Sequence, residues 1–365
     1  MNKQIPSSTF SIVKALGIIL VVISHSAIHT HLSTFAYLIN IAIFFFVAGY
    51  FFKDEYLYKP HLFFRKKIVR YYIPWVLYGL VFVFLHNAFL SLGLMTFDYK
   101  QNVAIEPYTF EDIVLKSIEV LSFFKWKEPL LAPLWFLFGM FSGFCVFYSI
   151  SWFAKKVGKT KFELVRAVLV VAVMIVGFLG DEYNLRLGII YRPMVISGLI
   201  YIGKLYSICA GKIKLSPIFA LLCFVALLIA TVYNYQINIG GMVFGNPILF
   251  LLISCVGNYM LLTLAYYIDA KTSTFSKVLN YIGAYSFSIM VLHYVSFKLV
   301  VFIQLWICNY PSNYLAYYPV IPYNTNYWWV AYTIVGVAVP LFLASSADFI
   351  KQKVTVIFKN RNLKL

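Results

Sequence analysis

Two side chains in the first apolar stretch of the chain have the types and the spacing that group-transfer chemistry needs. Lys14 and His25 lie eleven residues apart. On an α-helix this is about three turns and a rise of roughly 16 Å, so both side chains share one helix face. An imidazole titrates near neutrality and can take a proton from a hydroxyl group, while an ammonium attracts phosphate as a point charge. The spacing therefore predicts a catalytic base, His25, with a cationic partner, Lys14.

All ionisable residues that fall well inside the apolar segments are basic. They are Lys14, His25, His86, Arg192, His293 and Lys298. Charged groups are costly in hydrocarbon, so those found there usually face a cavity and mark function. An interior without carboxylates favours an anionic ligand or a developing negative charge, and it disfavours a pump that moves protons through buried acids. Two of the six have simpler interpretations: His86 would hydrogen-bond within the bundle, and Lys298 is equally consistent with snorkelling to the membrane surface.

The sequence contains no pattern for a serine nucleophile or a metal centre. Neither a G-x-S-x-G nor an H-E-x-x-H occurs, and the five cysteines have no metal-ligand spacing. The cysteines are best interpreted as small apolar side chains. We therefore expect direct transfer to a hydroxyl group, with no metal.

The composition places the chain in a membrane. Of its 365 residues 62% are hydrophobic and only 12% are charged, whereas a soluble domain has roughly 25% charged residues. The first apolar stretch runs past Ala27 without a cleavage site, so it is predicted to span the membrane. We predict an all-α, polytopic protein of about ten transmembrane helices, at 10–30, 34–52, 72–96, 133–153, 165–180, 187–207, 216–234, 247–268, 279–307 and 328–348.

The basic residues predict the orientation of these segments. With both termini in the cytoplasm, 22 of the 30 Lys and Arg residues fall in cytoplasmic segments, five fall in outer segments and three lie inside spans. This asymmetry follows the positive-inside rule, and one miscounted helix would have scrambled it. The net charge of +17 is therefore topological and does not indicate a nucleic-acid partner.

We expect residues 1–365 to form a single membrane domain with two long outer loops and a basic cytoplasmic tail at 349–365. The loop at 97–132 contains an amphipathic stretch, Glu111–Phe124, which could lie on the membrane surface or cover a pocket. The loop at 308–327 is rich in aromatic residues. An interfacial aromatic belt and a platform for stacking a sugar are both consistent with it.

Five motifs in a fixed order indicate a family. They are the Lys14 and His25 pair, the aromatic run Phe44–Phe51 that closes the second segment, the basic segment Arg65–Arg70 that enters the third, Leu134–Leu137 that opens the fourth, and Tyr285–His293 late in the chain. In this order they resemble the acyltransferase family 3 membrane proteins, which acylate, and often O-acetylate, bacterial cell-envelope glycans and related acceptors. The resemblance covers nearly the full length, and the family also has ten helices with the N-terminus inside.

The resemblance implies roles for particular residues. His25 would be the essential catalytic histidine and Lys14 its partner in the motif, while Arg65 and Arg70 would bind the donor. The remaining candidates for donor and substrate binding are Trp135, Arg192, Ser288 and His293. The chain departs from the family pattern at Lys14, where Arg is commoner and would bind phosphate with two nitrogens, and at Ala48, where Ser is frequent.

The expected activity is O-acylation in the cytoplasmic membrane of a bacterium. Acyl-CoA, with acetyl as the expected acyl group, would be the donor substrate and not a bound cofactor. The partners would be membrane lipid, a cell-envelope saccharide or glycolipid acceptor, and glycan-biosynthesis proteins. The alternative from another class is a transporter or flippase of a lipid-linked or anionic glycan, for which paired repeats and broken helices would be expected. A sugar sensor without chemistry is a third interpretation, and nothing attached to the core supports signalling.

Overall fold

The computed structural model describes residues 5–95, 106–123, 128–183, 188–322 and 327–362, without the side chains of 181, 182, 188, 189, 354 and 356–362. This part of the chain is built from helices and contains no β-strand, which confirms the all-α class. In chain order the elements are α1 (Ser7–Ser24), α2 (Thr30–Ile39), α3 (Ala42–Tyr50), η1 (Asp54–Leu57), α4 (Pro60–Lys67), η2 (Ile68–Tyr72), α5 (Ile73–Ser91), α6 (Phe110–Leu121), η3 (Pro129–Leu134), α7 (Trp135–Gly158), η4 (Lys159–Lys161), α8 (Phe162–Glu182), α9 (Gly188–Cys209), α10 (Pro217–Val232), α11 (Pro247–Ala270), α12 (Thr274–Ala284), α13 (Ser286–Cys308), η5 (Ser312–Ala316) and α14 (Trp328–Asn362).

The polytopic membrane class is also confirmed. Seven helical stretches of the described chain are long and apolar enough to cross a membrane, and one of them, Pro129–Gly180, contains α7 and most of α8. Every predicted segment coincides with one helix or with two successive helices. The count of about ten spans and the cytoplasmic termini remain predictions.

The first helix is shorter than predicted and ends just before His25. Helix α1 closes at Ser24, the next residues form a turn, and Ala27 takes a positive φ of 56°. The hydroxyl groups of Ser24 and Ser26 donate to the carbonyls of Val21 and Ile23, so they compete with the helical backbone bonds at this end. His25 is therefore the residue that caps α1, and the structure around it is irregular.

Helix α3 packs against α9 with the two backbones in contact. A Cβ atom at Gly49 would overlap the carbonyl oxygen of Ile200, and one at Gly203 would overlap that of Phe46. Small residues let membrane helices approach this closely. The glycine of the aromatic run Phe44–Phe51 is thus explained by packing.

The basic segment Arg65–Arg70, which lies outside the predicted spans, is helical. Pro60 occupies the first turn of α4, and α4 continues through the π-helical turn Ile68–Tyr72 into α5. No proline or glycine interrupts residues 61–73, so nothing breaks the helix there. The π-turn adds one residue to the helical register, and such turns are frequent at functional sites.

The predicted amphipathic stretch forms α6, which lies antiparallel along α5. Near the start of α6, the amide of Asn87 donates to the carbonyl of Tyr108. Near its end, Nε1 of Trp75 donates to the carbonyl of Val120 over 2.9 Å. Helix α6 therefore runs back along most of α5, and its exposed face is apolar, with Phe110, Val114, Leu115 and Ile118.

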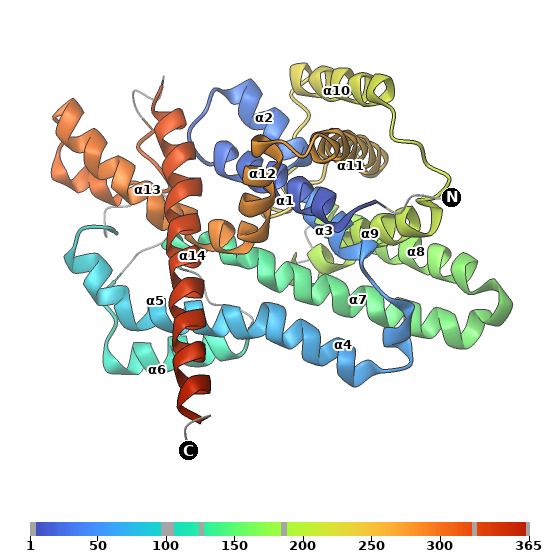
Figure 1. Cartoon of the computed structure of the whole chain (residues 1–365), viewed down its shortest axis with the longest axis horizontal. Coiled ribbons are helices and arrows are strands. Elements are labelled where there is room, and N and C mark those ends of the chain that lie inside the picture. The colour runs from blue at the N-terminus through green and yellow to red at the C-terminus, as the bar shows by residue number, and fades with distance from the viewer. Residues whose placement is uncertain (1–4, 96–105, 124–127, 184–187, 323–326, 363–365) are drawn as a thin grey trace.

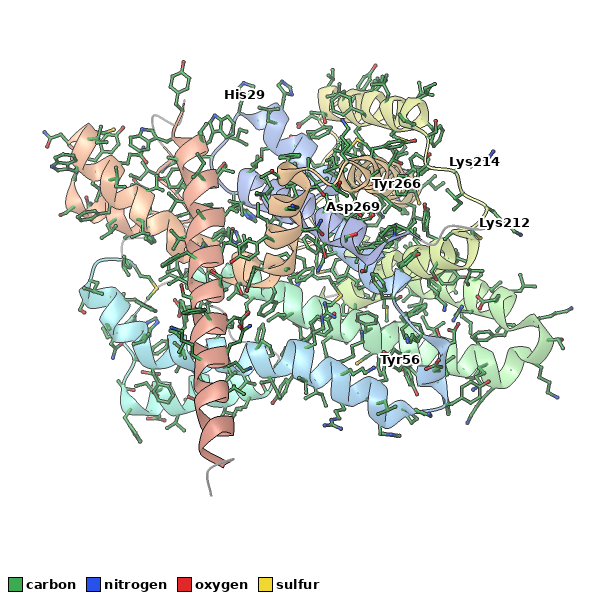
Figure 2. The ribbon with its side chains drawn as sticks, viewed as in Figure 1. His29, Tyr56, Lys212, Lys214, Tyr266 and Asp269 are labelled. Carbon is green, nitrogen blue, oxygen red and sulfur yellow. The ribbon has the colours of Figure 1, made fainter. Side chains whose placement is uncertain are left out.

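The core of the bundle is built around α1, which contacts α2, α3, α11, α12, α13 and α14. Ser8 and Thr9 at the start of α1 both donate to Asp269 at the end of α11, each over 2.7 Å, and Asp269 is labelled in the middle of Figure 2. The long helix α14 packs along α13, and in the view of Figure 1 its C-terminal end extends beyond the other helices.

Candidate active site

One large cavity contains both residues of the first-helix pair. It has a volume of about 1100 Å³, and Lys14 and His25 both line it. The two side chains that were predicted to share a helix face therefore line the same cavity. His29, four residues after His25, caps the start of α2 and is exposed near the edge of the molecule (Figure 2).

The cations of the cavity come from α1, α4 and η2. Besides Lys14, the lining includes Lys66, Lys67 and Arg70. We call these four residues the basic end. No carboxylate occurs among the described residues that line the cavity, so their positive charge is not neutralised within it.

Aromatic rings hold the side chains of the basic end. Nζ of Lys67 lies 3.1 Å from the ring centroid of Phe144. Nζ of Lys66 donates to the hydroxyl of Tyr56, which also lines the cavity, over 3.3 Å. Cation–π contacts of this kind fix an ammonium without cancelling its charge.

Arg70 lies in the cavity as predicted, whereas Arg65 does not. Arg65 is exposed and is not among the described lining residues. Residues 66, 67, 70 and 74 follow helical i, i+3 and i+4 spacing and face the cavity together, and residue 65 points about 100° away from residue 66. The sequence marked the right segment but not the face of the helix, so it missed Lys66 and Lys67.

A partly buried ion cluster anchors the segment that carries Tyr56. Asp54 in η1 binds Nη1 of Arg166 over 2.8 Å and Nζ of Lys204 over 2.7 Å. Arg166 is fully buried and also pairs with Glu163. Burial raises the pKa of Asp54, but the hydrogen bonds and charges of Lys204 and Arg166 outweigh it and hold that pKa below its ordinary value of 3.8.

His25 sits in a cage of aromatic rings. The Nδ1 atom of His25 lies 3.3 Å from Nε2 of His293, and the two rings stack with their centroids 5.4 Å apart. Tyr37 and Tyr294 meet the ring of His25 edge-on, at centroid distances of 5.9 and 5.1 Å. His293 is fully buried in α13 and is not among the described residues that line the cavity. The sequence identified both histidines but not their contact, nor the two tyrosines.

We call the part of the cavity formed by Trp135, Gly240, Tyr318 and Pro319 the aromatic end. Arg192 lies behind Trp135: its Nη2 donates to the carbonyl of Gly240 over 2.8 Å, and its guanidinium carbon is 5.1 Å from the indole centroid. Of the residues predicted to bind substrate, Trp135 therefore lines the cavity, whereas Arg192 and Ser288 are not among its described lining residues.

Two further buried residues, Lys298 and His86, hold neighbouring segments in place. Nζ of Lys298 donates to the carbonyls of Leu315 and Tyr317, over 2.8 and 2.7 Å, so it fixes the loop that carries Tyr318 and does not snorkel. His86 binds Glu128 over 3.2 Å. No local pattern indicated that Glu128 is buried, because it lies next to the fourth predicted segment and not inside it.

The fold and the cavity define a helical membrane protein with an internal, basic site built around an imidazole. A family model described as an acyltransferase domain, that of acyltransferase family 3, matches residues 9–347. The match covers almost the whole chain, so the protein belongs to this family and is a membrane acyltransferase. No curated protein and no solved structure matches the chain.

Proposed function

We propose that this acyltransferase moves an acyl group, acetyl in the simplest case, from acyl-CoA to a hydroxyl group of a cell-envelope saccharide. His25 is the general base, and the basic end binds the phosphates of the donor. The observation that carries this proposal is that one cavity contains an imidazole and four cations, with no carboxylate among its described lining residues. An anionic donor and a reaction that needs a base both fit such a cavity.

The proposed chemistry is direct transfer. The imidazole of His25 takes the proton of the acceptor hydroxyl group as its oxygen attacks the thioester carbonyl carbon. The tetrahedral intermediate then collapses, the carbon–sulfur bond breaks, and the leaving thiolate takes the proton back from the imidazolium. The products are an acyl ester and free CoA, and the histidine returns to its starting state.

The geometry supports separate ends for the two substrates. Lys14 lies about three turns, or roughly 16 Å, before His25 along α1. The nucleotide phosphates would sit at the basic end, and the pantetheine arm would lead the thioester along the cavity to His25. The aromatic end, where Trp135 and Tyr318 offer rings beside the polar side chain of Asn238, suits a sugar.

The charge distribution supports an orientation for this path. With 22 basic residues in the proposed cytoplasmic segments against five outside, α1 would run outward from the cytoplasm. The basic end would then face the cytoplasmic pool of acyl-CoA, and the aromatic end would face the acceptor. We place the protein in the cytoplasmic membrane of a bacterium on this basis.

The experiment that tests the proposal compares His25→Ala with His29→Ala in cells and in proteoliposomes. Both variants lose one histidine, but His29 is exposed and outside the cavity, so it is a matched control. Mass analysis of the envelope glycan should show one acyl group per modified site with the wild type and with His29→Ala, and none with His25→Ala. An acylated glycan in the His25→Ala strain would overturn the proposal, and so would transport of an unmodified glycan by the wild type.

A further inference from the structure

His25, which lines the cavity, contacts the fully buried imidazole of His293. The other ring nitrogen of His293 already contacts backbone carbonyl groups. Nδ1 of His293 lies 3.0 Å from the carbonyl oxygen of Ile289 and 2.8 Å from that of Met290. Nε2 of His293 lies 3.3 Å from Nδ1 of His25. Each contact is within hydrogen-bonding distance. The nitrogen of His293 that carries hydrogen therefore determines which nitrogen of His25 must carry it.

The carbonyl groups fix the tautomer of His293. A carbonyl oxygen accepts but never donates, so Nδ1 of His293 must carry hydrogen. In a neutral imidazole the other nitrogen then bears a lone pair. Nε2 of His293 is therefore an acceptor, and the bond to His25 forms only if Nδ1 of His25 carries hydrogen.

Both rings are neutral in the resting protein on physical grounds. Burying an imidazolium without an anionic partner is costly, and no carboxylate is among the described groups that contact either ring. With hydrogen on Nδ1, a neutral His25 bears its lone pair on Nε2. His25 lines the cavity and His293 is not among its described lining residues.

We infer that His293 is a positioning residue, which sets the tautomer of His25 so that Nε2 is the basic nitrogen offered to the acceptor hydroxyl group. This inference rests on the proposed function, in which His25 is the base. When His25 takes a proton, its Nδ1–H bond to His293 becomes charge-assisted and strengthens. His293 therefore favours the protonated intermediate as well as the resting tautomer, and it touches neither substrate.

Two substitutions separate positioning from simple packing. His293→Phe keeps a flat ring among Tyr294 and Phe297 but removes the acceptor. His293→Gln provides a side-chain oxygen that can again accept from Nδ1 of His25. We expect His293→Phe to lower kcat between about 10-fold and about 100-fold, which is a part of the contribution of about 10² to 10⁴ that a general base makes. KM for acyl-CoA should stay within twofold, and His293→Gln should recover part of kcat.

The tautomer can also be read without any reaction, by NMR of histidine-labelled protein in lipid, with His25→Ala used to assign the His25 signal. We expect hydrogen on Nδ1 of His25 in the wild type, and loss of that preference in His293→Phe. Hydrogen on Nε2 of His25 in the wild type would overturn the inference. So would full kcat in His293→Phe, or a rise in its KM with kcat unchanged.

These outcomes are distinguishable from failure of the proposed function. If His25→Ala keeps its acyltransferase activity, His25 is not the base and the proposed function fails. If His25→Ala is inactive while His293→Phe is fully active, only the inference about His293 fails. Because the NMR measurement of the tautomer uses only the wild type and His25→Ala, a misfolded His293→Phe protein still leaves the inference open to refutation.

Discussion

Lys67→Met should weaken the binding of acyl-CoA while leaving the transfer step almost unchanged. Lys67 lines the cavity at the basic end, and its ammonium lies against the ring of Phe144. Methionine has a similar apolar stem and fills much of the same space, so the main change is the loss of one positive charge. His25 and its aromatic cage come from α1, α2 and α13, and this substitution does not touch them.

The size of the effect follows from Coulomb's law. One ammonium and one phosphate charge about 6 Å apart attract each other by about 2.8 kcal/mol at an effective dielectric constant of about 20. Lys66 and Arg70 remain in the lining and share the same phosphates, so about half of this energy should be lost. Since about 1.4 kcal/mol is a factor of ten, we expect KM for acyl-CoA to rise about 10-fold, with kcat within about twofold.

Arg65→Met is the matched control for this measurement. It removes one positive charge from the same helix, two residues away, but Arg65 is exposed and outside the described lining. Initial rates in proteoliposomes would be measured for both variants, with acyl-CoA and with the acyl-pantetheine thioester that lacks phosphates. The increase in KM for Lys67→Met should appear with acyl-CoA and disappear with acyl-pantetheine.

Two results would refute this reasoning. If Arg65→Met raised KM as much as Lys67→Met, the net charge of the surface would explain binding and the cavity would not. If Lys67→Met raised KM equally for acyl-pantetheine, its ammonium would not act on the phosphates. Either result would remove the basic end from the proposed donor site, and would leave the role of His25 untouched.

Two other predictions concern stability. Gly49→Ala should destabilise the protein by about 1–3 kcal/mol, because the added Cβ overlaps the carbonyl of Ile200 and pushes α3 from α9; an unchanged Tm in detergent would contradict this. Asp54→Asn should lower stability by about 1 kcal/mol near neutral pH, since Asp54 is 39% exposed and screened. The folded-state pKa of Asp54 lies below 3.8, so its contribution is present above that pH and is lost as the pH falls through the folded-state pKa. The Tm difference from the wild type should thus persist down to about pH 4 and close at lower pH, and a difference that closed near pH 6 would exclude this cause.

The helical positions were predictable because hydropathy and helix length report directly on a lipid environment. Helix faces were less predictable. Lys14 lies in the regular part of α1 and His25 caps the end of the same helix, so their spacing was enough to bring both side chains to one cavity. Arg65 was predicted together with Arg70 but is not among the described lining residues, because the side-chain directions from residue 60 onward depend on where α4 starts and on the π-turn that follows.

Contacts between distant segments were not predictable from one sequence. His25 and His293 are 268 residues apart, and their hydrogen bond depends on how α13 packs against the end of α1. Glu128 illustrates the same limit: it falls in the predicted outer loop 97–132, yet it is buried against His86. In each case the polar partner lies on another element, and no local pattern in the chain specifies it.

The neutral partner behind His25 suits the reaction that we propose for this cavity. Acyl transfer places negative charge on the thioester oxygen, close to the base. A carboxylate behind His25 would orient the ring, but it would add a fixed negative charge beside that oxygen and would offset the cations that attract the donor. His293 orients the ring without charge, and its own Nδ1 is held by two backbone carbonyls. A neutral imidazole stabilises the imidazolium of His25 less than a carboxylate would. We therefore expect a smaller loss of rate from His293→Phe than the roughly 10⁴-fold loss that follows removal of the orienting carboxylate in a Ser-His-Asp triad.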